Sequence, residues 1–260
     1  MKSSVIYSCL LNDYSTISAA SKNLQKNFNF FLFSDQKISV NGWNVIRISN
    51  ENDFSPRRLA KMPKIQPWNF FESDYSVWID ANMELNEDIF IKTFEEFKNS
   101  KKSLGIFEHS SRNNILDEID DVKKRLKDDP VLLDSQKDEY KSNFGDLTKI
   151  SLYQGGFIMR DHSDPELRLS MNKWQKEIDK FSARDQISFP IALRNFPKEK
   201  IFLLKKDQFR KMVKINSHNK FTSEYKPKNL YEKFIINFNK LIYFALTNSL
   251  ISKIKKIFKE

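Results

Sequence analysis

Two oxygen-bearing side chains stand two positions apart at the end of a short apolar run. Residues 75–79 are β-branched and aromatic, which predicts a buried strand, and the run stops abruptly at Asp80-Ala81-Asn82. In open α/β sheets, ligands bind beyond the carboxyl ends of the strands. A carboxylate there with a second oxygen at i+2 suits a hard divalent cation that carries a diphosphate. Asp80 and Asn82 are therefore candidate metal ligands, although an Asx turn that ends a core strand would give the same tripeptide.

A basic segment, Arg57 to Lys64, comes just before this strand. Arg57 and Lys61 stand four positions apart, so on a helix they would share one face. Guanidinium and ammonium groups donate hydrogen bonds that match the oxygens of a diphosphate. We therefore expect Arg57 and Lys61 to bind the diphosphate of a ligand held at Asp80. A solvated helix face would produce the same cluster of charges.

Polar residues also follow the apolar run of residues 103–107, which predicts another strand. His109 and Arg112 come directly after this run, where the carboxyl end of a strand would bring them to the ligand site. Histidine changes its charge near neutral pH, and arginine binds phosphate oxygens, so we include both residues in the candidate site. A hydrogen-bonded structural histidine is the alternative interpretation of His109.

Two adjacent glycines, Gly155 and Gly156, open an apolar stretch that ends at Arg160 and predicts a strand. The chain has only five glycines, so their pairing here indicates a local need for a small residue. A close approach of the backbone to a ligand would require this, and so would a β-bulge.

Asp185 and Gln186 lie within the segment Ser182 to Phe189. We expect them at the N-terminus of a helix that faces the cleft, where a carboxylate can hold a sugar hydroxyl or act as a base. Arg184 precedes them and is a candidate ligand-binding cation. The structural alternative is a capping box in which Ser182 caps the helix and Asp185 stands three residues further on.

The elements that must position these groups alternate between strands and helices. Apolar runs predict strands over residues 5–11, 28–33 and 43–48. Helices are expected over residues 18–27, over 89–98 and, broken at Pro130 and with a charged, exposed surface, over 117–140. This order opens a doubly wound sheet, so the predicted fold class is α/β, with a Rossmann-type mixed sheet flanked by helices.

Composition and charge limit the possible classes of protein. With 260 residues, of which 40% are hydrophobic, the chain can form one large α/β domain with an appendage. Cys9 is the only cysteine, so no disulfide can form within the chain, and the first residues lack the apolar segment of a signal peptide. We therefore expect a cytoplasmic protein.

The basic charge is confined to the end of the chain. Residues 1–200 hold 30 Lys and Arg against 30 Asp and Glu, so the net charge of +10 comes entirely from residues 201–260. A neutral main domain without a recognisable binding motif argues against a nucleic-acid-binding protein. We divide the chain into a main domain, residues 1–215, and a basic amphipathic helical tail, residues 216–260.

The tail has the pattern of a membrane-surface helix. Residues 231–258 contain no Gly or Pro, and their apolar residues recur at spacings of three and four, which places them on one helix face. Lysines supply a cationic part that would favour an anionic membrane surface by on the order of 1 kcal/mol each. Lys240 and several Asn interrupt the run before the roughly 20 apolar residues of a membrane-spanning helix. The alternative is a helix that packs on the domain or on a second subunit.

Several of these segments, in this order, resemble a known family. Its matching blocks are Trp78-Ile-Asp-Ala-Asn82, Phe107-Glu-His-Ser-Ser-Arg112 with Glu118, Gly156 to Arg160 with His162, Trp174 with Glu177, and Arg184-Asp-Gln-Ile-Ser-Phe189. The sequence from about residue 5 to 195 is similar to a glycosyltransferase-like domain family, once catalogued as a domain of unknown function, that includes plant Golgi proteins linked to mucilage pectin. The resemblance implies a GT-A type fold, in which Mn²⁺ or Mg²⁺ at an Asp-x-Asp-like motif holds a nucleotide-sugar donor.

At such a donor site we expect the following roles for the candidate residues. Asp80, Asn82, Arg57, Lys61, Arg112, Gly155, Gly156 and Arg184 would bind the metal and the donor, while Asp185, Gln186 and His109 would act at the acceptor and at the anomeric centre. The Asp185-Gln186 pair looks like that of retaining, glycogenin-like enzymes. Two departures from the family matter: Asn82 replaces the second acidic residue of the motif, and the plant members have membrane anchors that this chain lacks.

The expected function is transfer of a sugar from a nucleoside diphosphate sugar to a glycan or lipid-linked glycan acceptor, in the synthesis of a surface polysaccharide. Two alternatives stay open at this stage. A catalytically inactive or binding-only relative would explain Asn82, and a glycoside hydrolase would use Asp80 and Asp185 as its paired carboxylates.

Overall fold

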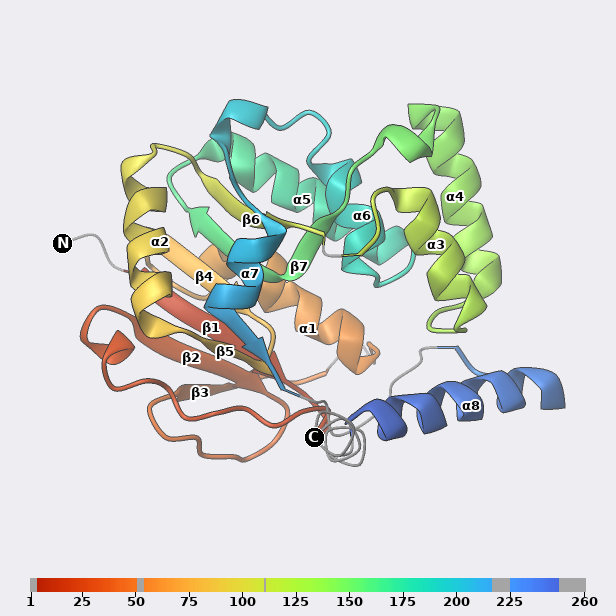
Figure 1. Cartoon of the computed structure of the whole chain (residues 1–260), viewed down its shortest axis with the longest axis horizontal. Coiled ribbons are helices and arrows are strands. Elements are labelled where there is room, and N and C mark those ends of the chain that lie inside the picture. The colour runs from red at the N-terminus through yellow and green to blue at the C-terminus, as the bar shows by residue number, and fades with distance from the viewer. Residues whose placement is uncertain (1–3, 51–53, 110, 217–224, 248–260) are drawn as a thin grey trace, which may run out of the picture.

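The computed structural model describes residues 4–50, 54–109, 111–216 and 225–247, with side chains in the last range described as far as residue 242. These residues form a seven-stranded sheet in the order β3-β2-β1-β4-β7-β6-β8 (Figure 1). The strands are β1 Ser4–Leu10, β2 Asn29–Ser34, β3 Asn44–Arg47, β4 Tyr75–Ile79, β6 Leu104–Glu108, β7 Tyr153–Asp161 and β8 Ile201–Leu204. β7 is antiparallel to β4 and β6, and the other neighbours pair in parallel. The predicted α/β class with a mixed sheet is therefore confirmed.

Alternation along the strands divides the core into two layers. Val77 and Ile79 of β4 point into the cluster that packs under α2, whereas Trp78 between them points into the cluster under α1, α5 and α6. All five residues of β4 are buried, because helices cover both faces of the sheet. The apolar, β-branched composition that predicted this strand follows from that double burial.

The helices lie on both faces and at one side of the sheet (Figure 1). They are α1 Pro56–Ile65, α2 Glu87–Asn99, α3 Ile115–Lys124, α4 Pro130–Phe144, α5 Pro165–Lys180, α6 Asp185–Ala192, α7 Lys206–Met212 and α8 Leu230–Thr247. Short 3₁₀ turns are η1 Leu24–Lys26, η2 Pro67–Asn69, η3 Leu147–Lys149 and η4 Lys198–Lys200. α3 and α4 share a separate apolar cluster with α6, which places them beside the N-terminus of α6.

A second, two-stranded sheet pairs β5 (Met83–Leu85) with β9 (Val213–Ile215) in antiparallel orientation. This pairing brings the chain back to the loop that follows β4. The N–H of Asn216 donates to the carbonyl of Asn82 at 2.7 Å, so a residue far along the chain fixes the candidate metal loop.

Two expectations from the sequence are wrong. Residues 18–27 form only the turn η1, because the Ser21 hydroxyl accepts the N–H groups of Asn23 and Leu24 and so competes with helical hydrogen bonds. The region 117–140 breaks at Pro130 as predicted but is not simply an exposed surface. Its two helices bury an apolar face, and Glu118 is fully buried.

Part of the predicted tail forms the helix α8. Ile235 and Ile236 pack against Leu126 and Tyr225, while the apolar side chains of the opposite face are exposed. The exposed residues are Leu230, Tyr231, Phe234, Phe238, Leu241 and Ile242. None of the described helices is both long enough and apolar enough to cross a membrane. The tail residues beyond 247 lie outside the described part of the chain, and the boundary at 215 stays a prediction.

Candidate active site

The candidate site lies at the edge of the sheet where β4 ends and β7 begins. Asp80 directly follows β4, and its N–H donates to the carbonyl of Gly156 at 2.9 Å. Because β7 runs antiparallel, its first residues reach the same edge as the carboxyl end of β4. α6 begins at Asp185 beside this edge, as the sequence predicted. Residues from three distant segments therefore meet at one place.

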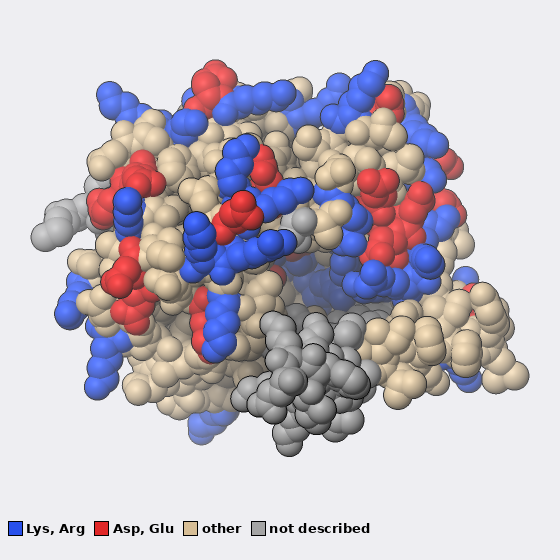
Figure 2. Space-filling model, viewed as in Figure 1, with Lys and Arg blue, Asp and Glu red and all other residues tan. Residues whose placement is uncertain are grey.

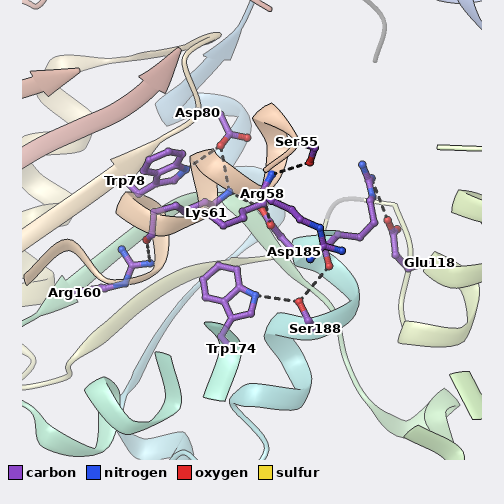
Figure 3. A network of polar contacts seen from close by, with 12 residues as sticks. Ser55, Arg58, Lys61, Trp78, Asp80, Glu118, Arg160, Trp174, Asp185 and Ser188 are labelled. Atoms are coloured by element: carbon purple, nitrogen blue, oxygen red, sulfur yellow. Dashed lines mark hydrogen bonds and ion pairs between the residues drawn. The ribbon is translucent and has the colours of Figure 1, made fainter. Parts of the chain in front are cut away.

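Two lysines of α1 join the carboxylates of this edge. Lys61 Nζ lies 2.6 Å from Asp185 Oδ1, and Lys64 Nζ lies 2.5 Å from Asp185 Oδ2. Lys64 Nζ also lies 3.3 Å from Asp80 Oδ1, which accepts a 2.8 Å hydrogen bond from Trp78 Nε1 (Figure 3). One ammonium thus bridges both carboxylates, and the four charged groups form a single ionic cluster.

The local sequence explains why α1 presents these lysines inward. Ser55 caps the helix by accepting the N–H of Arg58, and Pro56 occupies the first turn, where its missing N–H costs nothing. Arg58 donates to the carbonyls of Ile178 and Phe181, which ties α1 to the end of α5. Lys61 and Lys64 are three residues apart and so share the helix face turned to the sheet.

Electrostatics in this cluster are set by the two lysines and by burial. Burial alone would raise the pKa of Asp185, but Lys61 and Lys64 together hold it below its usual range. Burial lowers the pKa of Lys61 to about 8, against the opposing pull of Asp185. The pKa of Lys64 is raised, because its two carboxylate partners outweigh its desolvation. Asp185 is therefore an ionised carboxylate with little tendency to accept a proton.

The paired glycines make room for these carboxylates. A Cβ on Gly155 would lie 3.0 Å from Asp185 Cβ, and one on Gly156 would lie 3.0 Å from Asp80 Oδ2 and 2.3 Å from Met83 Cε. The β6–β7 register also shifts next to Ile106 and Phe107. The close approach and the β-bulge considered from the sequence therefore coexist, and the close approach is to the site's own side chains.

The two candidate metal ligands differ in their surroundings. The Asp80 side chain is 40% exposed, and its Oδ2 has no partner among the described residues. Asn82 is 5% exposed, and its Nδ2 donates to the carbonyl of Asn216 at 2.9 Å. No group of three or more His, Cys, Asp or Glu suited to a metal occurs among the described residues. Asp80 fits a cation such as Mg²⁺, which proteins often bind through one carboxylate and the phosphates of a substrate. The role of Asn82 as a metal ligand stays a prediction.

Beyond Asp185 the ionic contacts continue toward α3. Arg184 NH2 lies 3.6 Å from Glu118 Oε1, and Arg112 binds Glu118 through Nε. Arg112 NH1 also lies 3.3 Å from Asp121 Oδ2. Arg184 and Arg112, both candidate donor-binding residues, are therefore brought together, but around Glu118 and not around Asp80.

The other predicted residues are less directly placed. His109 is 4% exposed, and its Nδ1 accepts the N–H of Arg112 at 2.9 Å, which closes the loop after β6. Burial, with Arg112 adding to the effect, lowers the pKa of His109. Gln186 is half-buried in the first turn of α6. Arg57 NH1 donates to the carbonyl of Lys127 at 3.5 Å. The roles of His109, Gln186 and Arg57 stay predictions.

Ser182 does not cap α6. Its hydroxyl donates to Gln136 Oε1 at 2.7 Å, and the N-cap residue is Arg184, without a side-chain cap. The capping alternative for this segment is therefore wrong. Two functional candidates were also missed: Lys64, whose spacing of three from Lys61 was a usable signal, and Lys127, for which the sequence offered none.

The mixed sheet with helices on both faces defines a Rossmann-type α/β protein, and the ionic cluster lies at the edge where such sheets bind ligands. The chain belongs to the TOD1/MUCI70 glycosyltransferase-like domain family, which matches residues 2–218. A curated relative, the probable hexosyltransferase MUCI70 of Arabidopsis thaliana, is 32% identical over 169 residues. This match covers 61% of the chain and 28% of the relative, so it spans less than a third of the relative's length. The family expected from the sequence is confirmed.

Three solved structures illustrate the similarity of this chain to known proteins. The Mn/GDP form of core-mannan synthase A from Aspergillus fumigatus has a TM-score of 0.47 at 13% identity, over 92% of this chain and 85% of that one. Apo mouse xyloside xylosyltransferase 1 has a TM-score of 0.45 at 9% identity, over 76% of this chain and 84% of that one. Galactosyltransferase LgtC, in complex with donor and acceptor sugar analogs, has a TM-score of 0.42 at 9% identity, over 76% and 72%. The fold class follows from the order of the strands in the sheet and from the family.

Proposed function

We propose that this protein transfers a sugar from a nucleoside diphosphate sugar to a glycan or lipid-linked glycan acceptor in surface polysaccharide synthesis. The observation that carries this proposal is the ionic cluster of Asp80, Lys64, Lys61 and Asp185 at the edge of the sheet. Gly155 and Gly156 pack closely against its two carboxylates. The family is one of glycosyltransferase-like domains, so a donor site at this edge is the interpretation that accounts for the cluster.

Charge stabilisation is the chemistry that the cluster suits best. Breaking the bond between sugar and diphosphate leaves negative charge on the diphosphate, and preorganised cations beside it lower the barrier. A Mn²⁺ or Mg²⁺ ion at Asp80 would supply part of that charge when bound. Lys61 and Lys64, with their ammonium groups fixed by Asp185, would supply the rest.

The depressed pKa of Asp185 favours a particular role for it. A general base works best when its pKa lies near the working pH, and Asp185 is held well below its usual range by Lys61 and Lys64. An ionised, fixed carboxylate is better suited to accepting a hydrogen bond from a sugar hydroxyl, or to stabilising positive charge that develops at the anomeric carbon. We propose these positioning and electrostatic roles for Asp185.

The same property argues against the hydrolase alternative. A glycoside hydrolase with paired carboxylates needs one of them protonated near neutral pH, which requires a raised pKa. Asp185 has a lowered pKa and shares Lys64 with Asp80. A cluster built to keep Asp185 ionised is a poor source of the general acid.

Release of nucleoside diphosphate from a panel of UDP and GDP sugars, with and without Mn²⁺, tests the proposal. Asp80→Asn should lower the rate at least about a hundredfold, as removal of one electrostatic contact to the transition state does elsewhere. Asp138→Asn is the matched control, because Asp138 is exposed on α4. If nucleotide sugars raise the melting temperature but none is turned over, the binding-only relative becomes the better description, and if none does either, the inactive relative does.

We also propose that the protein is cytoplasmic and binds an anionic membrane surface through α8. Phe234 is 64% exposed and Phe238 50% exposed on the face turned away from the domain, and Lys233 and Lys240 are exposed on the same helix. Aromatic side chains with neighbouring lysines are typical of helices that lie in the membrane interface. Such an anchor would hold the site close to a lipid-linked acceptor.

A further inference from the structure

Four cations gather on the side of Asp185 that faces α3. They are Arg112 from the loop after β6, Arg125 and Lys127 from the end of α3 and the following turn, and Arg184 from the N-cap of α6. We call these four residues the cationic pocket. In the space-filling view, Lys and Arg side chains line the hollow that opens between α3 and α8 (Figure 2). The segments that carry the pocket are far apart in sequence, so the fold itself assembles it.

The pocket holds more positive charge than its carboxylate partners balance. Glu118 binds Arg112 and lies 3.6 Å from Arg184, and Asp121 binds Arg112 at 3.3 Å and Arg125 at 2.9 Å. Two carboxylates are thus shared among three guanidinium groups. Arg184 Nε is also buried without a hydrogen-bond partner among the described residues.

Lys127 makes the imbalance larger. Within the described part of the chain, no carboxylate forms an ion pair with its Nζ. Burial, with Arg184 and Arg125 adding to the effect, lowers the pKa of Lys127 to about 8. Burial and the charges of Arg184 and Arg125 therefore disfavour the protonated form of Lys127, and a bound anion would favour it.

The pocket lies across Asp185 from Asp80. Asp185 lies between Asp80 on one side and Glu118 on the other in the close view of the network (Figure 3). The contacts agree, because Lys64 joins Asp185 to Asp80, whereas the neighbouring Arg184 contacts Glu118. A ligand group in the pocket would therefore approach Asp185 from the side opposite Asp80.

We propose that the cationic pocket binds an anionic group, a phosphate or a carboxylate, that belongs to the acceptor. This inference rests on the proposed function, in which the donor diphosphate lies at Asp80 and Asp185 orients the acceptor. Arginine forks bind phosphates and carboxylates through paired hydrogen bonds, and an anion would relieve the repulsion among Arg125, Lys127 and Arg184. The acceptor is then a phosphorylated glycan, a lipid-phosphate-linked glycan or a uronate-containing glycan, and not a neutral sugar chain.

Lys127 gives the cleanest test, since its substitution breaks no described ion pair. Calorimetric titration of the full chain would use glucose 6-phosphate, glucuronate and neutral glucose as probes, each with and without saturating UDP. We expect at least one of the two anionic probes to bind, glucose not to bind, and UDP to leave the binding unchanged. Lys127→Gln should lower the affinity for the anionic probe about tenfold, the usual effect of losing one charge-assisted contact. Lys124→Gln is the matched control, because Lys124 is exposed three residues away at the end of α3.

A second readout separates ligand binding from a structural role. Lys127→Gln should leave the melting temperature of the free protein unchanged or higher, because it removes repulsion, whereas a structural lysine would lower it when replaced. The proposal is overturned if neither anion binds, if UDP displaces the probe, if both lysine variants weaken binding equally, or if Lys127→Gln lowers the melting temperature. The phosphate and uronate probes distinguish the two sources of the anion. If the unsubstituted protein binds the anionic probe but turns over no nucleotide sugar, the result would count against the proposed function and not against the cationic pocket.

Discussion

Lys64 and Asp185 form a buried ion pair, Nζ to Oδ2 at 2.5 Å, between residues 121 positions apart in the sequence. Because the same ammonium reaches Asp80 at 3.3 Å, it couples the end of β4 to the start of α6. Lys64 is 2% exposed, so its charge is balanced almost entirely by these two carboxylates. Lys64 therefore links the donor side and the acceptor side of the proposed site directly.

Removing that side chain should be costly to the fold. In Lys64→Met, Asp185 keeps only Lys61 as a partner, so part of the buried charge of the Asp185 carboxylate is uncompensated. We expect a loss of about 3–5 kcal/mol in the free energy of unfolding, the range found when one partner of a buried ion pair is removed. Urea unfolding followed by circular dichroism measures it. Lys92→Met on the exposed side of α2 is the control, and an equal, small effect of both variants would show that the pair contributes little.

Lys61 should make nucleotide binding sensitive to pH. Burial lowers its pKa to about 8, so the ammonium loses its proton as the pH rises through about 8, well below the ordinary lysine value of 10.5. Only the protonated form attracts a diphosphate, so the affinity for UDP should fall between about pH 7 and 9. Titration calorimetry in the presence of Mg²⁺ would follow it. Lys61→Arg keeps its charge over this range and should remove the dependence. A flat profile for the unsubstituted protein would contradict the assignment.

The strand edge could be predicted because its signals are local. The apolar run of β4 stops at Asp80, and α6 starts at Asp185, so both carboxylates were located from neighbouring residues alone. The orientation of Asn82 could not be predicted, because it is set by Asn216, 134 positions away. The burial of Lys64 likewise depends on Asp185, which approaches only in the folded chain.

Side chains also overrode backbone propensity where the prediction failed. The segment 18–27 has a composition compatible with a helix, yet the Ser21 hydroxyl satisfies the N–H groups of Asn23 and Leu24 and leaves only η1. Glu118 shows the opposite case. It stands in a charged stretch that suggests a solvated surface, but Arg112 and Arg184 make its burial tolerable. A local sequence pattern cannot predict ionic partners that come from distant segments of the chain.

Gly156 should be needed for the position of Asp80 and less for the fold. A Cβ there would lie 2.3 Å from Met83 Cε, which can move, and 3.0 Å from Asp80 Oδ2. Gly156→Ala should therefore lower turnover at least about tenfold through displacement of the carboxylate, with a melting temperature only slightly changed. The double variant Met83→Ala/Gly156→Ala removes the contact with methionine. Recovery of full turnover in the double variant would show that Met83, and not Asp80, was responsible.

The exposed face of α8 should determine whether the protein binds membranes. Phe234 and Phe238 lie on the face turned away from Ile235 and Ile236, which pack on the domain, so the helix can bind a surface while it stays docked. Burying a phenylalanine contributes about 1.5–3 kcal/mol, so Phe234→Ala/Phe238→Ala, which removes two of them, should weaken binding to anionic vesicles by about a hundredfold or more. Alanine is a strong helix former, so the helix itself is preserved.

Flotation with vesicles that contain phosphatidylserine, compared with neutral vesicles, measures this binding. Asn237→Ala is the control, because it replaces an exposed polar side chain of α8 and removes no apolar surface. Binding should also fall as salt is raised, since Lys233 and Lys240 contribute through charge. The proposal is contradicted if the double variant and Asn237→Ala float equally well, or if the unsubstituted chain does not float at all. The apolar face must then be covered by another part of the protein or by a second subunit. Light scattering at several protein concentrations would distinguish these two cases.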